Sequence, residues 1–477
     1  MSDFPTQLLI NGQWLDGSGA KRLAIVNPAT EETFAEVCSA TADEIGQAAE
    51  AGQAAFESGW RDMPPGERTR LLRNLAKRIH ENVETLAQLE TRNVGKPIGD
   101  ARWEADAGAK VFDYYAGAIG HLCGQTIPVA RGGFDFTLRQ PMGVIAAITP
   151  WNFPFLIACW KVAPALAAGN SVVLKPASLT PLTALMLGQL AQEAGLPDGV
   201  LQVVPGSGSE AGNALATHPL VRKIGFTGST EVGATIMKLA ADDIKRVSLE
   251  LGGKSPNIVF ADADWQRAAA ESPMSVFANT GQDCCARSRM FIEQSVFDGF
   301  VDQFVAATES LKIGDPMDEA TQVGPMVSAA QRELSESHIA GARDAGREIR
   351  TGGDRPNGGG FYLNPAVVTG VETKDRAWRE EIFGPVVCLR PFTDETEMLR
   401  EVNDTNFGLS GSVWSNDLSR ALRVARQVES GVISVNSHSS VHTEAPFGGF
   451  KRSGLGRDLG MSAMEACTEV KNIYVGE

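Results

Sequence analysis

From residue 142 onward, short apolar runs alternate with longer amphipathic stretches, and this rhythm limits the possible folds more than any other feature. The runs are GVIAAIT, NSVVLKP, VLQVVPG, KIGFTG, RVSLEL and NIVF, and the amphipathic stretches include LTALMLGQLAQEAG and VGATIMKLAADDI. Strands that alternate with helices of this length predict an α/β fold with a parallel, doubly wound sheet. A second series after residue 290, with MFIEQ and a helix over 296–311, predicts a second α/β domain.

The first 141 residues and the last 11 carry other patterns. Asn11-Gly12 between LLI and QWL predicts a β-hairpin. Residues 41–59, 64–95 and about 103–122 have apolar residues at helical spacing, so three helices are expected there. The closing CTEVKNIYVGE reads as a lone strand, which must pair with another sheet.

Length and composition limit the class of protein to which this chain can belong. A chain of 477 residues exceeds one ordinary core, so about two or three domains are expected. Hydrophobic content of 43% with 21% charged residues is typical of a soluble enzyme, and the net charge of −15 argues against a nucleic-acid partner. Seven scattered cysteines without Cys-x-x-Cys or Cys/His ligand spacing indicate a reducing compartment, without a disulfide framework or a zinc site.

Neither a signal peptide nor a membrane span is expected. The N-terminus lacks a basic segment followed by an apolar one. The most apolar stretch, 155–174, is interrupted by Lys161, Pro164 and Gly169–Asn170, so it is interpreted as buried core. The expected location is therefore the cytosol, with no membrane partner.

Two glycine-rich turns follow predicted strands. Each can present backbone N–H groups to a pyrophosphate at a helix N-terminus, although ordinary tight turns explain such patterns equally well. No G-x-x-x-x-G-K-[ST] motif occurs, which argues against a P-loop triphosphatase. The residues of the two turns are Gly206, Gly208 and Ala211, and Gly228, Ser229, Thr230 and Gly233.

Two adjacent cysteines, Cys284 and Cys285, lie in FANTGQDCCARSR (277–289), among residues that favour turns. A thiol with its ordinary pKa of about 8.5 is only a few per cent thiolate at neutral pH, so a nucleophile here needs a base. None of the six histidines lies in a stretch typical of a cysteine protease. A disulfide between neighbouring residues would close a strained ring.

Two polar residues in apolar surroundings are the other candidates for chemistry. Glu250 ends an apolar strand just before Gly252–Gly253, which suits either a general base or a carboxylate paired with a distant Arg or Lys. Asn152 in TPWNFPF is either a turn former or a donor to a developing oxyanion.

Taken together, these segments resemble the aldehyde dehydrogenase superfamily over essentially the whole chain. The resemblance implies a Rossmann-like cofactor domain (1–117 and 142–252), a catalytic domain (253–450) and a small β oligomerisation arm (118–141 and 451–477). It also implies a homodimer or homotetramer in which the terminal strand pairs with a neighbouring subunit's sheet. The matching segments are TPWNFP (149–154), LKPAS (174–178), FTGSTEVG (226–233), LELGGKSPNI (249–258), FANTGQDCCARSR (277–289), EEIFGPVV (380–387) and PFGGFKRSGLGRDLG (446–460).

The resemblance also implies residue roles. On the G-Q-x-C spacing Cys284 matches the nucleophile, Glu250 the general base, and Asn152 with the Cys284 backbone N–H the oxyanion hole. Lys161 and Asp458 resemble a proton exit route, although Glu is common at the position of Asp458. The residues that match the binding site of NAD or NADP are Trp151, Lys175, Ser178, Gly208, Gly228, Ser229, Gly233, Glu381 and Phe383.

The implied reaction is oxidation of an aldehyde to its carboxylic acid. The Cys284 thiolate adds to the aldehyde, hydride passes to NAD or NADP, and Glu250 activates the water that hydrolyses the resulting thioester; no metal is expected. One alternative is an acylating relative, in which phosphate or coenzyme A resolves the thioester, and the presence of Glu250 argues against it. Another is an inactive binding or structural protein, against which the retained Cys284, Glu250, Asn152 and Lys175 argue.

The sequence constrains the identity of the aldehyde substrate less than it constrains the reaction. Succinic semialdehyde relatives often carry Arg where Trp160 stands, so a non-acidic aliphatic, aromatic or amino aldehyde is expected, with succinic semialdehyde as the alternative. Glu104 and Asp106 favour a cationic amine, whereas Phe153 replaces a Tyr frequent in aminoaldehyde enzymes. Ser178 stands where NAD-preferring relatives commonly carry Glu, which predicts that NADP is accepted.

Overall fold

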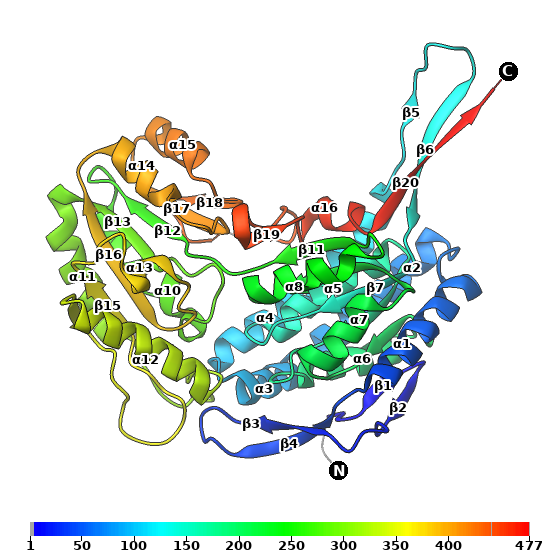
Figure 1. Ribbon diagram of the computed structural model, residues 1–477, viewed down its shortest axis with the longest axis horizontal. Coiled ribbons are helices and arrows are strands. Elements are labelled where there is room, and N and C mark those ends of the chain that lie inside the picture. Colours follow the sequence, from blue (N-terminus) through cyan, green and yellow to red (C-terminus); the bar gives the residue numbers. More distant parts are fainter. Residues whose placement is uncertain (1–3, 440, 477) are drawn as a thin grey trace.

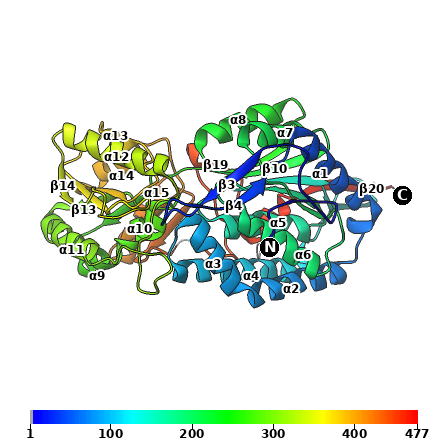
Figure 2. The ribbon, with the colours of Figure 1, turned by 90° about the horizontal axis from the view of Figure 1, so that it is seen from below.

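The computed structural model describes residues 4–439 and 441–476. Two lobes, each built on its own β-sheet, lie side by side, and a narrow β arm projects from one of them beside the C-terminus (Figure 1). A hairpin of β3 (Arg22–Val26) and β4 (Thr33–Cys38) runs between the lobes (Figure 2). Its turn reaches the second lobe, where the Phe361 backbone N–H donates to the Pro28 carbonyl at 2.9 Å.

The sheet of the first lobe has the order β19-β11-β10-β7-β8-β9-β1-β2, and its five central strands are parallel. The chain proceeds outward from β7 to β8 and β9, then returns to the other side of β7 for β10 and β11. This reversal confirms the predicted doubly wound α/β sheet and creates a switch point between β7 and β10, where such sheets bind ligands. The bounds are β7 Val144–Ile148, β8 Ser171–Lys175, β9 Leu201–Val203, β10 Val221–Thr227, β11 Arg246–Glu250, β19 Gly454–Leu455, α5 Pro154–Ala167, α6 Leu182–Glu193, α7 Asn213–Thr217 and α8 Thr230–Ala241.

The N-terminal hairpin of β1 (Leu8–Ile10) and β2 (Gln13–Leu15) is confirmed, with Asn11 and Gly12 at φ of 49° and 75°. Three predicted helical stretches become four α-helices, because the pattern over 64–95 is interrupted at Asn82. There the Asn82 side-chain amide donates to the Arg78 carbonyl at 2.8 Å and so caps the end of the first helix. The helices are α1 Ala42–Ala55, α2 Pro65–Glu81, α3 Val83–Val94 and α4 Ile98–Ala118.

The second lobe contains a sheet in the order β14-β15-β16-β13-β12-β17-β18, in which only β14 is antiparallel to its neighbour. The helix expected over 296–311 is present as α11. The strands are β12 Pro256–Val259, β13 Arg289–Glu293, β14 Glu348–Thr351, β15 Ala366–Thr369, β16 Val386–Phe392, β17 Ser410–Trp414 and β18 Val432–Val435. The helices are α9 Trp265–Glu271, α10 Met274–Phe277, α11 Phe297–Glu309, α12 Ala329–Asp344, α13 Arg376–Arg379, α14 Glu395–Asn403 and α15 Leu418–Gln427.

The arm is a three-stranded sheet of β5 (Thr126–Ile127), β6 (Phe134–Pro141) and β20 (Thr468–Val475), which follows α16 (Gly460–Glu465). β20 pairs with β6 of its own chain along its whole length, from Thr468 opposite Pro141 to Val475 opposite Phe134. β6, which has the same length, therefore supplies one partner within the chain. β20 is an edge strand of this sheet, so pairing of its other edge with a neighbouring subunit's sheet stays a prediction.

The apolar stretch 155–174 is core, as its interrupted pattern predicts. Every residue of α5 and of β8 is buried. The same hydrophobic cluster extends across the lobe boundary to Cys285, Leu409 and Phe447, so the lobes share a packed interface. Among the residues that the structure describes, none of the helices combines the length and apolarity that a bilayer crossing requires.

Candidate active site

Two cavities meet between the lobes. One, of about 780 Å³, lies over the carboxyl ends of β7 and β10, and the other, of about 410 Å³, lies between α4, α5 and the loops of the second lobe. Cys284 and Glu250 line both cavities, so the predicted nucleophile and the predicted base lie where the cavities join. The other shared lining residues are Ile157, Thr227 and Leu251.

The loop before Cys284 is held in an unusual backbone conformation. Asn279, Thr280 and Gly281 have successive positive φ values of 48°, 59° and 71°. Such a conformation is costly for a β-branched residue, and the Thr280 hydroxyl compensates by donating to the Gly324 carbonyl at 2.9 Å. A Cβ on Gly281 would lie 2.2 Å from the Gly384 carbonyl oxygen, so only glycine fits. Strain at this loop is consistent with a functional site.

Gln282 fixes the loop from inside. Its side chain is fully buried, donates to the Asn279 carbonyl at 3.0 Å and accepts from the Val327 backbone N–H at 2.9 Å. The Gly-Gln pair of the G-Q-x-C motif therefore has a structural reason: the glycine permits the turn, and the glutamine ties it to the neighbouring segment.

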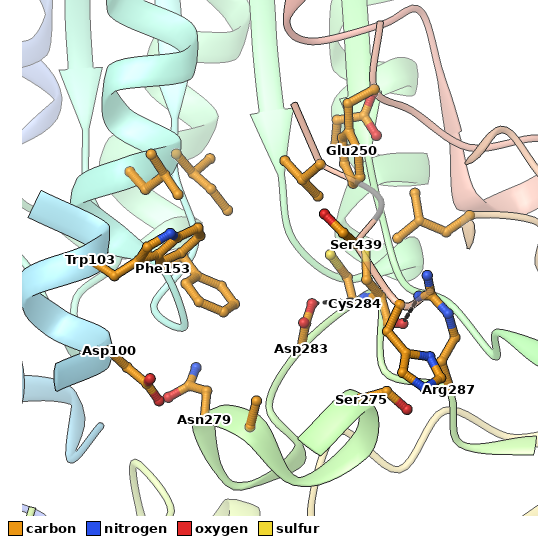
Figure 3. Close-up of a pocket in the computed structure, with 18 of the residues that line it drawn as sticks. Asp100, Trp103, Phe153, Glu250, Ser275, Asn279, Asp283, Cys284, Arg287 and Ser439 are labelled. Atoms are coloured by element: carbon orange, nitrogen blue, oxygen red, sulfur yellow. Dashed lines mark hydrogen bonds between the residues drawn. The ribbon is translucent and has the colours of Figure 1, made fainter. Parts of the chain in front are cut away.

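The two cysteines have different surroundings. Cys284 is partly exposed to the cavities, opposite a wall that includes Trp103 and Phe153 (Figure 3), whereas Cys285 is buried. A hydrogen bond with the Cys285 thiol, followed by burial and the nearby carboxylate of Asp283, raises the pKa of the Cys284 thiol well above its usual range. The free thiol is thus mostly protonated at neutral pH, and its use as a nucleophile requires a proton acceptor.

Glu250 ends β11 and is 3% exposed. Neither of its carboxylate oxygens has a hydrogen-bond partner among the described residues, and no ion pair with Arg or Lys is present there. Burial raises the pKa of Glu250 well above its usual range, and Asp458 adds to this effect, while Lys161 and Arg457 oppose it. A carboxyl group in this state accepts a proton more readily than an exposed carboxylate does.

Lys161 of α5 and Asp458, after β19, form a buried ion pair of 2.8 Å. Both lie close enough to Glu250 to shift its pKa, but neither lines a cavity. They lie behind the candidate base.

Asn152 lies at the start of the loop that leads into α5. Its side-chain amide donates to the Gln282 carbonyl at 3.0 Å, and its backbone carbonyl accepts from the Asn279 side chain at 2.9 Å. These bonds tie Asn152 to the loop that carries Cys284. A primary amide has a second N–H, so Asn152 retains one donor for a ligand.

Eight of the nine residues expected at the cofactor line the larger cavity. The exception is Gly233, which lies inside α8, where a Cβ would come within 2.7 Å of the Leu251 side chain; its size matters for packing. The Ser229 hydroxyl accepts the Val232 backbone N–H at 3.3 Å and caps the first turn of α8. The eight are Trp151, Lys175, Ser178, Gly208, Gly228, Ser229, Glu381 and Phe383.

Lys175 and Ser178 both make bonds to backbone carbonyls. The Lys175 ammonium donates to the Pro176 carbonyl at 3.0 Å, and burial lowers its pKa to about 8. The Ser178 hydroxyl donates to the Gly206 carbonyl at 3.0 Å. The serine is therefore uncharged and already bonded, which leaves Lys175 as the local charge.

Glu381 and Phe383 close the opposite end of the cavity. The Glu381 carboxylate accepts the Gly253 backbone N–H at 2.8 Å, and burial raises its pKa to about 7. A Cβ on Gly252 would lie 2.0 Å from a Glu381 oxygen, which explains why the Gly-Gly pair follows β11. The ring of Phe383 stands edge-on to Trp151, with centroids 5.2 Å apart.

The smaller cavity has an aromatic wall and several acidic groups. Trp160 and Phe447 pack edge-on at 5.3 Å, and Trp103 and Phe153 continue the wall. Sequence reasoning missed the carboxylates Asp100, Glu271 and Asp283, since no motif links these separate segments. The proposal that Glu104 and Asp106 face the substrate is wrong. Glu104 is buried against Lys96, and Asp106 pairs with Lys110 at 2.6 Å and lies beside His80 of α2; neither carboxylate lines the cavity.

The two cations that line this cavity are already engaged. Lys96 is bound to Glu104, and its ammonium lies 4.3 Å from the centroid of the Phe153 ring. The Arg287 guanidinium donates to the Cys285 carbonyl and, at 3.2 Å, to the Ser412 hydroxyl. The remaining Arg287 nitrogen, Nη2, is enclosed without a hydrogen-bond partner among the described residues.

A doubly wound sheet with a cavity at its switch point is the arrangement in which nucleotide-binding α/β proteins hold their ligand, and here that cavity joins one that contains a thiol and a buried carboxylate. The family model described as "Aldehyde dehydrogenase family" matches residues 14–473. This chain belongs to the aldehyde dehydrogenase family, as its motifs predict.

Relatives support this assignment over nearly the full length. Phenylacetaldehyde dehydrogenase from Pseudomonas fluorescens is 43% identical over 99% of this chain and 96% of the relative. Betaine aldehyde dehydrogenase 1 from Oryza sativa subsp. japonica is 43% identical over 98% and 94%. Among solved structures, an NAD⁺ complex of Bacillus cereus aldehyde dehydrogenase has a TM-score of 0.97 at 40% identity, covering 99% of this chain and 96% of that one. An E. coli NADP dependent enzyme has a TM-score of 0.98 at 40% identity, covering 99% and 98%.

Proposed function

We propose that this protein oxidises a non-acidic aldehyde to its carboxylic acid through a thiohemiacetal and a thioester on Cys284, using NAD or NADP. The observation that supports this most is the position of Cys284 and Glu250 at the junction of the two cavities. A reaction between a cofactor in one cavity and a substrate in the other requires its nucleophile at that junction.

The larger cavity fits a nicotinamide dinucleotide. It lies at the sheet's switch point beside the N-terminus of α8, whose backbone N–H groups suit a pyrophosphate. Lys175 and Ser178 would hold the adenosine ribose, and Glu381 and Phe383 the nicotinamide ribose and ring. When bound, the nicotinamide supplies the acceptor for the hydride that the aldehyde carbon loses. The structural neighbours named for NAD⁺ and NADP support this choice.

The chain's own residues supply the remaining chemistry. The thiol proton of Cys284 passes to Glu250, and the sulfur bonds to the carbonyl carbon. The free N–H of the Asn152 amide and the Cys284 backbone N–H donate to the developing oxyanion; one such donor typically contributes about 3–4 kcal/mol. Lys161 and Asp458 would carry the thiol proton away from Glu250 before hydrolysis begins. After oxidation, the ionised Glu250 takes a proton from water, the water oxygen adds to the thioester carbon, and the C–S bond breaks with the sulfur leaving as thiolate.

The substrate cavity supports a neutral or cationic aldehyde. Its aromatic wall suits an apolar substituent, while Asp100, Glu271 and Asp283 disfavour a substrate that carries a carboxylate. Both lining cations are neutralised or bonded to protein groups, so no free arginine is available to clamp succinic semialdehyde. The two relatives named above for phenylacetaldehyde and betaine aldehyde are consistent with this class.

The same proposal includes assembly, domains and location. The arm exposes Phe134, Val470 and Tyr474, which suits burial against another copy in a homodimer or homotetramer. The cofactor, catalytic and arm domains inferred from the sequence remain part of the proposal, and three separate sheets support them. One strand of the inferred 451–477 arm segment, β19, pairs with β11 in the sheet of the first lobe instead. All seven cysteines are free, which supports the cytosolic location.

The proposal is tested by trapping the acyl group. Phenylacetaldehyde and NAD⁺ are mixed with the Glu250→Gln variant, the reaction is quenched in acid, and peptides are analysed by mass spectrometry. An acyl mass on the peptide that carries Cys284 is expected, with reduced cofactor formed in equal amount. Reduced cofactor without any acylated cysteine would rule out the thioester route.

A further inference from the structure

Asp283, Cys284 and Cys285 place three metal-ligating atoms together. One carboxylate oxygen and the two sulfurs all lie within 4.8 Å of one another, and within residues 4–439 and 441–476 this is the one such group of His, Cys, Asp or Glu. The Cys285 backbone N–H donates to Asp283 Oδ1 at 2.8 Å, which folds the carboxylate back beside Cys284 (Figure 3). All three residues line the substrate-side cavity.

We propose that this cluster is a binding site for a soft divalent cation, with Zn²⁺ as the preferred ion, and that occupation inhibits the enzyme reversibly. The inhibition rests on the proposed role of Cys284 as nucleophile. The ion would have no part in catalysis.

The donor set and its spacing suit zinc. Zn²⁺ takes thiolate sulfur at about 2.3 Å and carboxylate oxygen at about 2.0–2.2 Å in tetrahedral geometry, so its donors lie roughly 3.6–3.8 Å apart. The three atoms here are at most about an ångström beyond that spacing, which rotation of the side chains can supply. The fourth position would face the cavity and take a water molecule.

The surrounding charges favour a cation. Glu250, Asp100 and Glu271 line the same cavity. Of the two positive side chains there, Lys96 is bound to Glu104, and Arg287 donates to the Cys285 carbonyl and to Ser412. Arg287 opposes a cation at this site, because its charge lies beside the Cys285 thiol and interacts with it. Its other bonds join it to the backbone and to β17, and zinc would have to displace its contact with the sulfur.

Zinc binding and inhibition both follow from the replacement of two thiol protons by the ion. The two thiols lose their protons to solvent as the sulfur–zinc bonds form, and no electrons are transferred because Zn²⁺ is not redox-active. The Cys284 lone pair that would attack an aldehyde is then held by the ion. A chelator that removes the ion returns the protons and restores the nucleophile.

The experiment uses the full-length protein after treatment with a chelator. Zn²⁺ binding is measured by calorimetry, and Cd²⁺ binding by the ultraviolet absorbance of its thiolate bonds. Aldehyde oxidation and labelling of Cys284 by iodoacetamide are followed in parallel. We expect one ion per chain, loss of activity, protection of Cys284 from labelling, and full recovery with chelator.

Two variants test the ligands. Asp283→Asn keeps an oxygen that accepts the Cys285 N–H but removes the charged ligand, and Cys285→Ser removes one sulfur. Since even indirect partners of a metal typically account for about 10–100-fold in affinity, each change should weaken Zn²⁺ binding at least about tenfold. Cys123→Ser, at an exposed cysteine, should leave Zn²⁺ affinity unchanged. Glu271→Gln, at a carboxylate of the same cavity outside the cluster, should weaken Zn²⁺ binding less than either ligand variant, because it removes a nearby charge and no ligand.

Absence of bound ion, or equal Zn²⁺ affinity in the wild type and Asp283→Asn, would overturn the proposal, and the second comparison decides it even if Cys285→Ser does not fold. The proposed function is judged separately, by Cys284→Ser without any added metal. Should that variant stay active, the assigned nucleophile is wrong, whatever the metal titrations show.

Discussion

The cofactor-side cavity and the substrate-side cavity meet at Cys284, yet they are built in different ways. The first is formed mostly by the carboxyl ends of adjacent parallel strands and the turns that follow them. The second is assembled from α4, α5, the 271–287 segment and the residues His438, Ser439, Val441 and Phe447, which come from distant parts of the sequence. A shared strand edge imposes a fixed geometry, whereas separate segments can change independently, so cofactor binding is expected to be general and substrate binding particular to this chain.

The largest effect is expected at the junction itself. Cys284→Ser should lower kcat by at least about 10⁴-fold, since removal of a nucleophile in a comparable catalytic unit costs about 10⁶-fold. Cys285→Ser should retain most of the activity, because Cys285 is buried behind the nucleophile. Steady-state rates with phenylacetaldehyde, with circular dichroism to confirm folding, measure both. An equal loss in two folded variants would contradict the choice of Cys284.

Glu250→Gln should have the second largest effect. Loss of a positioned base typically lowers the rate about 10²–10⁴-fold, and here the loss should fall both on formation of the Cys284 thiolate and on hydrolysis of the acyl enzyme. The wild-type rate should increase with pH as the raised pKa of Glu250 is passed, because only the ionised carboxylate accepts a proton. Asp458→Asn is the control for the exit route and should reduce kcat less. If Glu250→Gln shows the wild-type pH profile, the base is another group.

On the cofactor side, the change Ser178→Glu should discriminate between the two dinucleotides. A carboxylate beside Lys175 would repel the 2′-phosphate of NADP, and a charge-assisted contact of about 1.5–3 kcal/mol corresponds to roughly ten- to a hundredfold. We therefore expect kcat/KM for NADP to fall by that factor, with NAD little affected. Ser178→Gln, similar in size but uncharged, is the matched control. Absence of wild-type turnover with millimolar NADP would contradict this electrostatic argument.

A smaller effect on the same cavity is expected from pH. Burial lowers the pKa of Lys175 to about 8, so its charge is present below that pH and is lost above it. NADP carries one phosphate more than NAD, and its KM should therefore rise more steeply between about pH 7 and about pH 9. Parallel increases for both cofactors would show that Lys175 does not contact the extra phosphate.

The sequence predicts the cofactor side in more detail than the substrate side, for a physical reason. Glycines such as Gly252 and Gly281 are required where side chains or backbone approach within van der Waals distance, and they mark their turns in the sequence. The parallel strands are equally visible, because they are buried on both faces. In contrast, Asp100 and Glu271 lie on helices, and the hydrophobic pattern of a helix does not show which distant segment a polar side chain faces.

One misassignment has a clear cause. Glu104 was expected at the substrate, but helical spacing shows only which residues share a face, and Lys96, eight positions earlier, turns that carboxylate into the core. The pairing of the terminal strand with β6 of its own chain was equally absent from the sequence pattern, whereas its pairing with another subunit stays a prediction. Neither contact is encoded in any short pattern of a single sequence.

The smallest and most specific effect is expected from Asp100→Asn on the substrate side. Asp100 is partly exposed in the cavity, and an ion pair in such a position is worth up to about 1 kcal/mol, or roughly fivefold in KM. The KM of an aminoaldehyde should rise by about that factor, while that of phenylacetaldehyde should stay unchanged, because the aromatic wall contacts only its apolar part. A panel of aldehydes scored by kcat/KM gives the test. An about tenfold wild-type preference for succinic semialdehyde would instead assign the substrate's distal group to Arg287, whose enclosed Nη2 would then have to turn toward the cavity.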